Sequence, residues 1–242
     1  MGFTVAVTTD QRRDDLANVL EECGARVVLA PALRLVALPD DARLRDVPVY
    51  RWLPPADPTP LQRLVDLIRS RLVDAVTFTS APAVLALLRA AGADTESVLA
   101  ALRSEVLAGC VGLVSATPLR RRGVPVLASD RADLGELARE LAAELTRRTR
   151  TVHIGGSELV LRGHAAVVDG ELKPLPPAPM AVLRALAAAP GRVLPRSELL
   201  GALPRGADEH AVEMAVARLR AALGRSTLIQ TVVKRGYRLR VD

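Results

Sequence analysis

Near the C-terminus, hydrophobic residues first follow the period of a helix and then that of β-strands. The apolar positions between 212 and 223 are spaced i, i+3, i+4, i+7 and i+11, which predicts one buried face of a helix over 208–223. These positions are Val212, Ala215, Val216, Leu219 and Leu223. Asp208 and Glu209 open this helix and Gly224 ends it. Beyond it, the segments 229–233 and 237–241 flank Lys234-Arg235-Gly236, a pattern that predicts a β-hairpin with a basic tip.

The first 147 residues alternate short β-rich runs with amphipathic helical stretches. Strands are predicted at 3–8, 26–30, 75–79, 106–112 and 124–128. A first helix is predicted with Asp10 as its cap, an apolar stripe over 16–23 and Gly24 at its end, and further helices have apolar positions over 61–72, 84–91 and 134–145. Because the chain opens as β-α-β, we expect a doubly wound, mostly parallel five-stranded α/β domain. The basic segment 147–150 joins it to the C-terminal part.

The overall composition is compatible with two modest domains. The chain has 242 residues, of which 50% are hydrophobic and only 2% aromatic, so the cores must be built from Leu, Val and Ala. No apolar run reaches the roughly 18 to 20 residues that a membrane span needs, and the N-terminus enters a strand-like run directly. We therefore expect a cytoplasmic protein without a membrane segment.

Positive charge is concentrated in the C-terminal segment. The chain carries a net charge of +6, and residues 196–240 hold nine basic side chains against four acidic ones. The basic residues are Arg196, Arg205, Arg218, Arg220, Arg225, Lys234, Arg235, Arg238 and Arg240, and the acidic ones are Glu198, Asp208, Glu209 and Glu213. Such an excess favours a polyanionic partner, although the net charge would also suit membrane lipid. A short helix with arginines, followed by a basic hairpin, suits double-stranded DNA. A merely solvated basic surface is the alternative interpretation.

Cysteine and histidine residues do not suggest a metal or cofactor site. Cys23 lies on an apolar helical stripe and Cys110 in a strand-like run, as buried small hydrophobic residues do. His153, His164 and His210 have no metal-ligand spacing. We expect neither a metal nor a cofactor.

Several motifs follow one another in the last ninety residues. They are Pro190-Gly191-Arg192-Val193-Leu194, Arg196-Ser197-Glu198-Leu199-Leu200, the segment 217–224 (ARLRAALG), Ile229-Gln230-Thr231-Val232 and Gly236-Tyr237-Arg238-Leu239. Because these motifs occur in this order, the segment from about 151 to the end resembles the OmpR/PhoB-type winged-helix DNA-binding domain. The resemblance implies an α+β winged helix-turn-helix fold with helices at 177–189, 195–202 and 208–223. It also implies an antiparallel platform with strands at 153–154, 159–161, 166–168 and 171–175 and a turn at Asp169-Gly170.

The same resemblance implies which residues contact DNA. Arg218 and Arg220 would face the double helix from the recognition helix, Thr231 would bind a phosphate, and the wing tip would reach the minor groove. The implied contact residues are Arg218, Arg220, His210, Thr231, Lys234, Arg235 and Arg238. Family members often have basic residues where this chain has Ala217, Ala221 and Val233, so we expect weaker or more salt-sensitive binding.

The N-terminal domain does not have the pattern of a phosphoreceiver. A receiver needs an acidic pair directly after the first strand and an aspartate at the end of the third. Here the first strand is followed by Thr9 and Asp10, and the strand at 75 ends in Thr79-Ser80.

The N-terminal motifs point to a different family. They are 3–8 with Cys23-Gly24-Ala25, the segments 47–52 (VPVYRW), 74–84 (DAVTFTSAPAV) and 108–118 (AGCVGLVSATP), and Gly123-Val124-Pro125. Residues 1–146 resemble uroporphyrinogen-III synthase, in particular the form fused to a winged helix in some actinobacteria. That fold has a second lobe inserted into the first, and its tetrapyrrole substrate lies between the two. In this chain, the residues that open the first lobe run to about Arg45, and the segment that re-enters this lobe begins at Val47. The junction near 45–47 therefore leaves no room for the inserted lobe.

These resemblances predict two domains, 1–147 and 151–242. A linear tetrapyrrole needs two walls to hold it bent while its terminal ring is inverted. We therefore expect no synthase activity from this chain.

Candidate ligand-binding residues lie at the carboxyl ends of the predicted strands, where open α/β sheets bind ligands. They are Thr79, Ser80, Gly112 and Ser115, together with Tyr50 near the former lobe junction. Their hydroxyl and backbone N–H groups would bind the carboxylates of a tetrapyrrole. Helix capping by Ser80 and Ser115 is the alternative. For Arg120-Arg121-Arg122 we favour an interaction with a helix C-terminus over a ligand site.

The leading hypothesis is a DNA-binding transcriptional regulator that binds as a homodimer, with a sensing or dimerising domain derived from uroporphyrinogen-III synthase. The alternatives are a synthase of tetrapyrrole biosynthesis that carries a DNA-binding module, and a pseudo-enzyme that binds a porphyrin.

Overall fold

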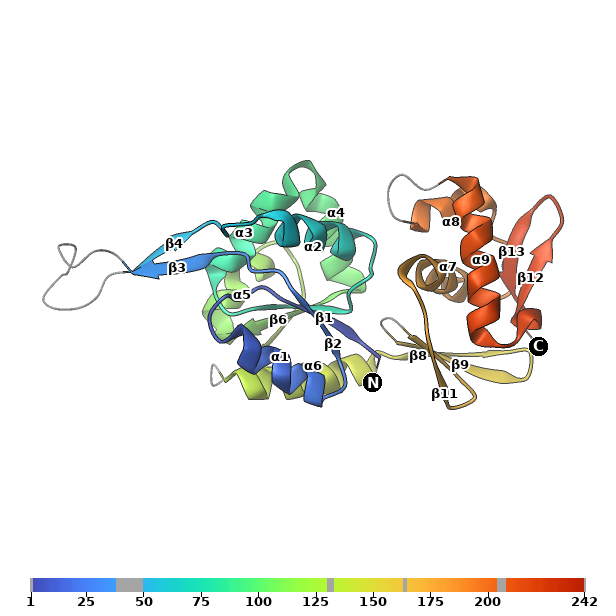
Figure 1. Ribbon diagram of the computed structural model, residues 1–242, viewed down its shortest axis with the longest axis horizontal. Helices are drawn as coiled ribbons and strands as arrows, with labels where there is room; N and C mark the ends of the chain where they lie inside the picture. Colours follow the sequence, from blue (N-terminus) through green and yellow to red (C-terminus); the bar gives the residue numbers. More distant parts are fainter. Residues whose placement is uncertain (1, 38–49, 130–132, 163–164, 204–207, 242) are drawn as a thin grey trace, which may run out of the picture. The chain divides into compact units, whose positions relative to one another are not determined.

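The computed structural model describes residues 2–37, 50–129, 133–162, 165–203 and 208–241 (Figure 1). The chain divides into two compact units. One unit, here called the α/β unit, comprises Thr4–Arg69 and Val73–Leu145. The other, here called the C-terminal unit, comprises Thr146–Asp242 together with Met1–Phe3 and Ser70–Leu72.

The α/β unit is built on a five-stranded parallel sheet, as predicted. Its strands are β1 (Thr4–Val7), β2 (Arg26–Leu29), β5 (Ala75–Phe78), β6 (Leu107–Val111) and β7 (Val126–Ser129), in the order β2-β1-β5-β6-β7. All four neighbouring pairs are parallel, for example with Val5 opposite both Val27 and Ala75. The strand order reverses between β1 and β5, which makes the fold doubly wound.

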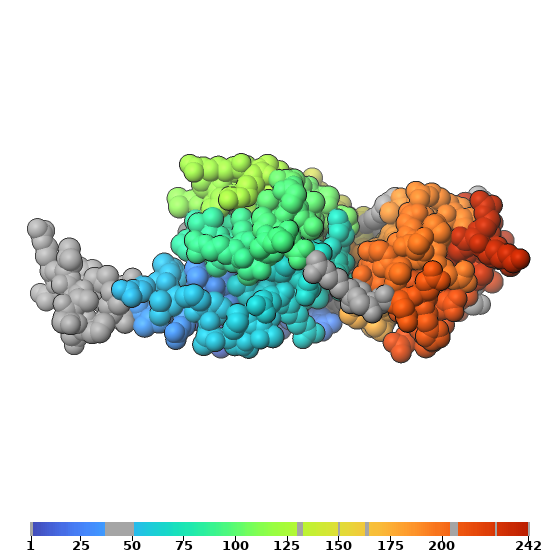
Figure 2. Space-filling model, turned by 90° about the horizontal axis from the view of Figure 1, so that it is seen from above, coloured from blue at the N-terminus to red at the C-terminus, as the bar shows by residue number. Residues whose placement is uncertain are grey.

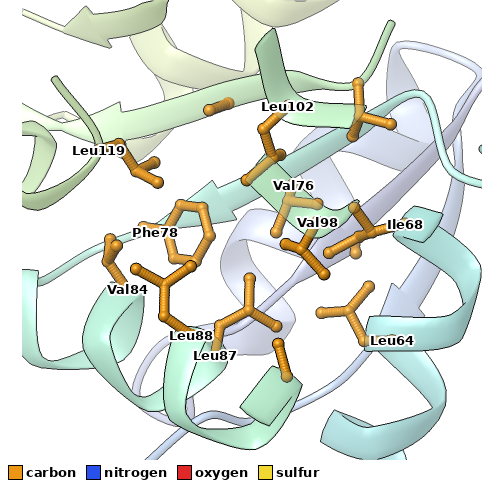
Figure 3. Packing of buried hydrophobic residues seen from close by; sticks show 14 of the residues in the cluster. Leu64, Ile68, Val76, Phe78, Val84, Leu87, Leu88, Val98, Leu102 and Leu119 are labelled. Atoms are coloured by element: carbon orange, nitrogen blue, oxygen red, sulfur yellow. The ribbon is translucent and has the colours of Figure 1, made fainter. Parts of the chain in front are cut away.

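Helices cover both faces of this sheet (Figure 1). One face carries α2 (Thr59–Arg69), α3 (Ala81–Ala91), α4 (Thr95–Ser104) and α5 (Gly112–Arg120), whose apolar residues share one core with Ala6, Val76 and Cys110. Phe78 points from β5 toward Val84 and Leu88 of α3 in this core (Figure 3). The other face carries α1 (Arg13–Glu22) and α6 (Leu134–Arg147). Gly109 lies under Leu141 of α6, where an added Cβ would come within 2.9 Å of that side chain.

Two helices and two strands of the α/β unit were not predicted. They are α4, α5 and an antiparallel pair, β3 (Arg34–Ala37) and β4 (Tyr50–Leu53). A short 3₁₀ helix at Gly92–Asp94 precedes α4. The predicted cap of α1 is wrong: α1 begins at Arg13, its N-cap is Arg12 in the left-handed conformation, and no side chain caps it. Asp10 lies outside the first turn, where it pairs with Arg13 across 3.6 Å.

The C-terminal unit begins with an antiparallel platform. Its strands are β8 (Arg150–Ile154), β9 (Ser157–Arg162), β10 (Ala165–Val168) and β11 (Glu171–Pro174), in the order β11-β10-β9-β8. The predicted turn at Asp169-Gly170 joins β10 to β11, and both residues have positive φ angles of 50° and 85°. The Asp169 carboxylate accepts the Glu158 backbone N–H at 2.9 Å, which ties this turn to β9.

Three helices and a hairpin complete the C-terminal unit, as the winged-helix resemblance implies. The helices are α7 (Pro177–Ala188), α8 (Arg196–Ala202) and α9 (Glu209–Leu223). After a 3₁₀ turn at Ser226–Leu228, β12 (Ile229–Val232) and β13 (Gly236–Leu239) form the hairpin, here called the wing. Their core includes Leu183, Leu199, Val216 and Leu239. Beside the wing, Leu194 forms an isolated antiparallel bridge with Tyr237.

None of the helices in the described parts of the chain is long and apolar enough to cross a membrane.

Candidate nucleic-acid interface

Helix α9 presents one exposed face because both its ends are fixed and its other face is buried. The Asp208 side chain accepts the Ala211 backbone N–H at 2.8 Å, and Gly224 ends the helix with φ 69°. The predicted stripe is buried: Val212, Ala215, Val216, Leu219 and Leu223. The residues of α9 that are exposed include His210, Glu213, Met214, Ala217, Arg218 and Ala221. Arg218 therefore lies on the outer side of the helix.

The wing carries its two exposed cations at a tight turn. The Arg235 backbone N–H donates to the Val232 carbonyl at 2.9 Å, and Lys234 takes a left-handed conformation with φ 59°. Thr231 lies in β12 opposite Tyr237 and is exposed. Figure 2 shows the wing, in red, standing out from the orange helices of its own unit. Lys234 and Arg235 are both exposed in the turn at its tip.

Arg220 does not point away from the protein but binds the wing. Its guanidinium donates to the Ile229 carbonyl from Nε at 3.1 Å and from Nη2 at 2.7 Å, and Nη2 also donates to Thr231 Oγ1 at 2.9 Å. It lies 5.9 Å from the centroid of the Tyr237 ring, and the Arg196 guanidinium lies 5.6 Å from the same centroid. Arg196 also pairs with Glu213 at 3.1 Å. These contacts fix the position of the wing relative to α9.

Other cations of the segment also have partners within the unit. Arg225 donates to Ser157 Oγ at 2.5 Å and pairs with Asp169 at 2.9 Å, which ties the end of α9 to the platform. Arg238 donates to Gln230 Oε1 at 2.9 Å across the wing. Among the described cations of 196–240, those that are exposed and have no such partner are Arg218, Lys234, Arg235 and Arg240. Arg205 lies outside the described residues.

The predicted DNA-contact residues thus fall into two groups. Arg218, His210, Lys234 and Arg235 are exposed on α9 and at the wing tip. Arg220, Thr231 and Arg238 are joined to neighbouring groups by hydrogen bonds. The sequence could not separate these groups, because the separating contacts join α9 to the wing or link the two strands of the wing. DNA contact by any of these residues stays a prediction.

In the α/β unit, the candidate ligand residues do not form an exposed polar cluster among the residues described. Ser80 caps α3 by accepting the Ala83 N–H at 3.3 Å, which confirms capping for this residue. Capping by Ser115 is wrong, because α5 begins at Gly112 and buries Ser115 in its interior. Thr79 is half-buried, Gly112 has φ 75°, and Tyr50 lies in β4. Their binding of a tetrapyrrole stays a prediction.

The hydroxyl groups beneath this edge of the sheet already have partners. Thr8 Oγ1 donates to the Thr77 carbonyl at 2.6 Å, and Thr77 Oγ1 donates to the Ala6 carbonyl at 3.1 Å. They bind β1 to β5 where the strand order reverses.

The Arg120-Arg121-Arg122 run interacts with a helix C-terminus, as predicted. Arg122 Nη1 donates to the Pro118 carbonyl of α5 at 2.8 Å. The Arg122 carbonyl in turn accepts from Arg103 of α4 at 3.1 and 2.9 Å.

The two cysteines and the acidic residues suggest no metal chemistry in the described regions. Cys110 is buried in β6, and this burial raises the pKa of its thiol to about 12, so the thiol stays protonated and unreactive. Within the residues that the structure describes, no three His, Cys, Asp or Glu side chains are grouped as metal ligands would be.

Two family models match separate parts of the chain. Residues 170–239 match the model described as "Transcriptional regulatory protein, C terminal", and residues 37–139 match that described as "Uroporphyrinogen-III synthase HemD". The chain joins a uroporphyrinogen-III synthase-like domain to an OmpR/PhoB-type DNA-binding domain. Both resemblances seen in the sequence are therefore confirmed, and the match to the transcriptional-regulator model lies within the C-terminal unit. No curated protein matches the chain.

Solved structures agree with the fold of the uroporphyrinogen-III synthase-like domain. The wild-type uroporphyrinogen III synthase of Thermus thermophilus is 18% identical over 60% of this chain and 98% of its own, with a TM-score of 0.51. The RstA DNA-binding domain of Klebsiella pneumoniae, solved in complex with the RstA box, is 27% identical over 38% of this chain and 97% of its own, with a TM-score of 0.32. The response regulator DrrB of Thermotoga maritima is 16% identical over 99% and 100%, with a TM-score of 0.34. At these TM-scores, only the similarity to the Thermus thermophilus synthase bears on the fold.

Proposed function

We propose that this protein is a transcriptional regulator that binds double-stranded DNA with α9 in the major groove and the tip of the wing on flanking phosphates or in the minor groove. The single observation that carries the proposal is the distribution of cations over α9 and the wing. Arg196, Arg220, Arg225 and Arg238 hold the unit together, whereas Arg218, Lys234 and Arg235 are exposed on α9 and at the wing tip. Side chains at these places could contact bases from α9 and phosphates from the wing.

A selection from a random pool of duplexes tests the proposal. The full chain is expected to enrich a defined sequence and to bind it more tightly than a random duplex. Affinity should fall steeply with salt, because cations at the interface displace counterions from the phosphates. Equal affinity for enriched and random duplexes at every salt concentration would contradict the proposal.

We infer that the uroporphyrinogen-III synthase-like domain is a single lobe that senses a ligand or forms a dimer and no longer catalyses ring closure. Only twelve residues, 38–49, separate the end of β3 at Ala37 from the start of β4 at Tyr50. Ala37 pairs with Tyr50, so the chain leaves and returns at neighbouring points, as it does around an inserted domain. Twelve residues are too few for a second α/β lobe, which needs at least about 50. The predicted junction at 45–47 lies outside the described residues.

The catalytic alternative has a direct test. The full chain is incubated with hydroxymethylbilane, and the type I and type III isomers of the product are separated. We expect only the spontaneous type I isomer. Formation of the type III isomer would identify an active synthase. Fluorescence titration with a porphyrin tests whether the lobe binds a tetrapyrrole without converting it.

A homodimer on DNA is the form that we propose, because one module makes too few base contacts for high specificity. Exposed apolar side chains of the α/β unit support a contact there: Trp52 (45% exposed), Leu113 (57%) and Val114 (80%). Sedimentation of the full chain with and without DNA should detect a dimer, and Val114→Asp should weaken it. A strict monomer under both conditions would remove this part of the proposal.

A further inference from the structure

The outermost line of α9 is almost uncharged. His210, Met214, Ala217 and Ala221 follow one another at i, i+4, i+7 and i+11, and all four are exposed. They lie opposite the buried stripe that contains Leu219. This line is here called the outer ridge. Met214, a large apolar side chain, is 42% exposed.

The charged residues beside the outer ridge are mostly engaged elsewhere. On one side, Glu213 pairs with Arg196 at 3.1 Å, and Arg220 donates its hydrogen bonds to β12. On the other side, Arg218 is exposed, and no intramolecular partner is described for it. Within α9 as described, Arg218 is the one guanidinium that is available to a base.

The chemistry of the outer ridge matches one feature of the major groove. Thymine alone presents a methyl group there, and alanine and other apolar side chains contact it, whereas an arginine binds O6 and N7 of guanine through two hydrogen bonds. Two alanines also allow the backbone of α9 to approach the bases closely. An apolar ridge with one neighbouring arginine therefore suits thymines next to a guanine.

We propose that the outer ridge recognises the 5-methyl groups of thymines, through Met214, Ala217 and Ala221, beside a single guanine bound by Arg218. This specificity rests on the proposed function, since it requires α9 to lie in the major groove. The predicted half-site is rich in A·T pairs and contains one essential G·C pair.

Replacing thymine by deoxyuridine removes only the methyl group and so tests the proposal directly. In the duplex enriched by the full chain, each thymine is replaced in turn and the dissociation constant is measured. Each methyl group that contacts the ridge is expected to contribute about fourfold in affinity. Thymines outside the bound segment serve as the control and should be insensitive.

The outcomes separate this inference from the proposed function. If no duplex is enriched, both fail. If a duplex is enriched but contains no thymine at the essential positions, or if deoxyuridine leaves the affinity unchanged throughout, the inference is wrong and the proposed function stands. Loss of affinity at two or more neighbouring thymines supports the inference.

Variants of Met214 provide a matched comparison, because this side chain is exposed and its replacement leaves the core intact. In Met214→Ala, replacing one of the thymines by deoxyuridine should no longer lower the affinity. In Met214→Leu the loss of affinity should remain, since leucine is also large and apolar. Far-UV circular dichroism of both variants should equal that of the unmodified chain. An unchanged deoxyuridine effect at every thymine in Met214→Ala would overturn the role of this residue.

Discussion

The guanidinium carbon of Arg220 lies 5.9 Å from the centroid of the Tyr237 ring, and through this contact α9 is joined to the wing. The same guanidinium donates hydrogen bonds to Ile229 and Thr231 of β12. The two elements for which we propose DNA contact, α9 and the wing, are thus held together by one side chain. Such preorganisation reduces the entropy that must be lost when DNA is bound.

Replacing Arg220 should loosen the wing. Arg220→Ala removes charge-assisted hydrogen bonds to two groups of β12 and is expected to destabilise the hairpin by about 1.5 to 3 kcal/mol. Hydrogen exchange of the β12 and β13 amides in the full chain should then be faster by roughly ten- to a hundredfold. Arg218→Ala is the matched control and should leave exchange unchanged. Unaltered exchange in Arg220→Ala would mean that the contact does not hold the wing.

Gly236 is required by a close approach of two backbone segments. A Cβ at this position would lie 2.0 Å from the Leu194 carbonyl oxygen, and its φ of 130° is unfavourable for other residues. Gly236→Ala should therefore destabilise the C-terminal unit by at least about 3 kcal/mol. Gly224→Ala is the control, because Gly224 has φ 69° with open space around it, and it should cost about 1 kcal/mol. Calorimetry of the full chain measures both, and equal losses would contradict the steric argument.

Lys234 combines a strained conformation with an exposed charge at the wing tip. Lys234→Gly removes the charge but accepts φ 59° without strain, so stability should change by less than about 1 kcal/mol. DNA affinity should fall, and the slope of log affinity against log salt should become shallower by about 1. Fluorescence anisotropy over a range of salt concentrations measures this slope. A slope equal to that of the unmodified chain would exclude a phosphate contact by Lys234.

Local signals in the sequence were sufficient for much of the fold. Asp208 and Gly224 predicted both ends of α9 because a cap and a left-handed glycine act within one turn of the helix. The alternation of strands and helices predicted the five parallel strands for a similar reason. Each buried strand is a short apolar run that can be recognised from its own residues.

Elements that depend on distant contacts were missed or misplaced. Helix α5 contains Pro118, and a proline within a segment argues against a helix there. The helix forms nevertheless, and its residues Ala116 and Leu119 are buried in the core of the unit. Asp10 resembles a cap, but the chain makes a further left-handed turn at Arg12 before α1 begins. The roles of Arg218 and Arg220 could not be distinguished either, because the wing that binds Arg220 is formed by residues further along the chain.

The buried thiol of Cys110 predicts a loss of stability at high pH. Burial raises its pKa from 9.0 to about 12, so above pH 9 the unfolded chain releases the thiol proton while the folded chain retains it. The free energy of unfolding should therefore fall above pH 9, by up to about 1.4 kcal/mol per pH unit. Urea unfolding of the full chain on both sides of pH 9 measures this change. Cys110→Ala should show a smaller pH dependence, and an identical one would contradict the assignment.

Arg218 gives the most direct test of DNA recognition by α9. Arg218→Ala should lower affinity for the enriched duplex by about 1 to 3 kcal/mol, because a bidentate contact to a guanine is lost. Its affinity for a random duplex should change little, and the two dissociation constants are measured side by side by anisotropy at one salt concentration. A large loss confined to the enriched duplex is the predicted result. Equal losses on both duplexes, or no loss on either, would contradict the placement of this helix face against the bases.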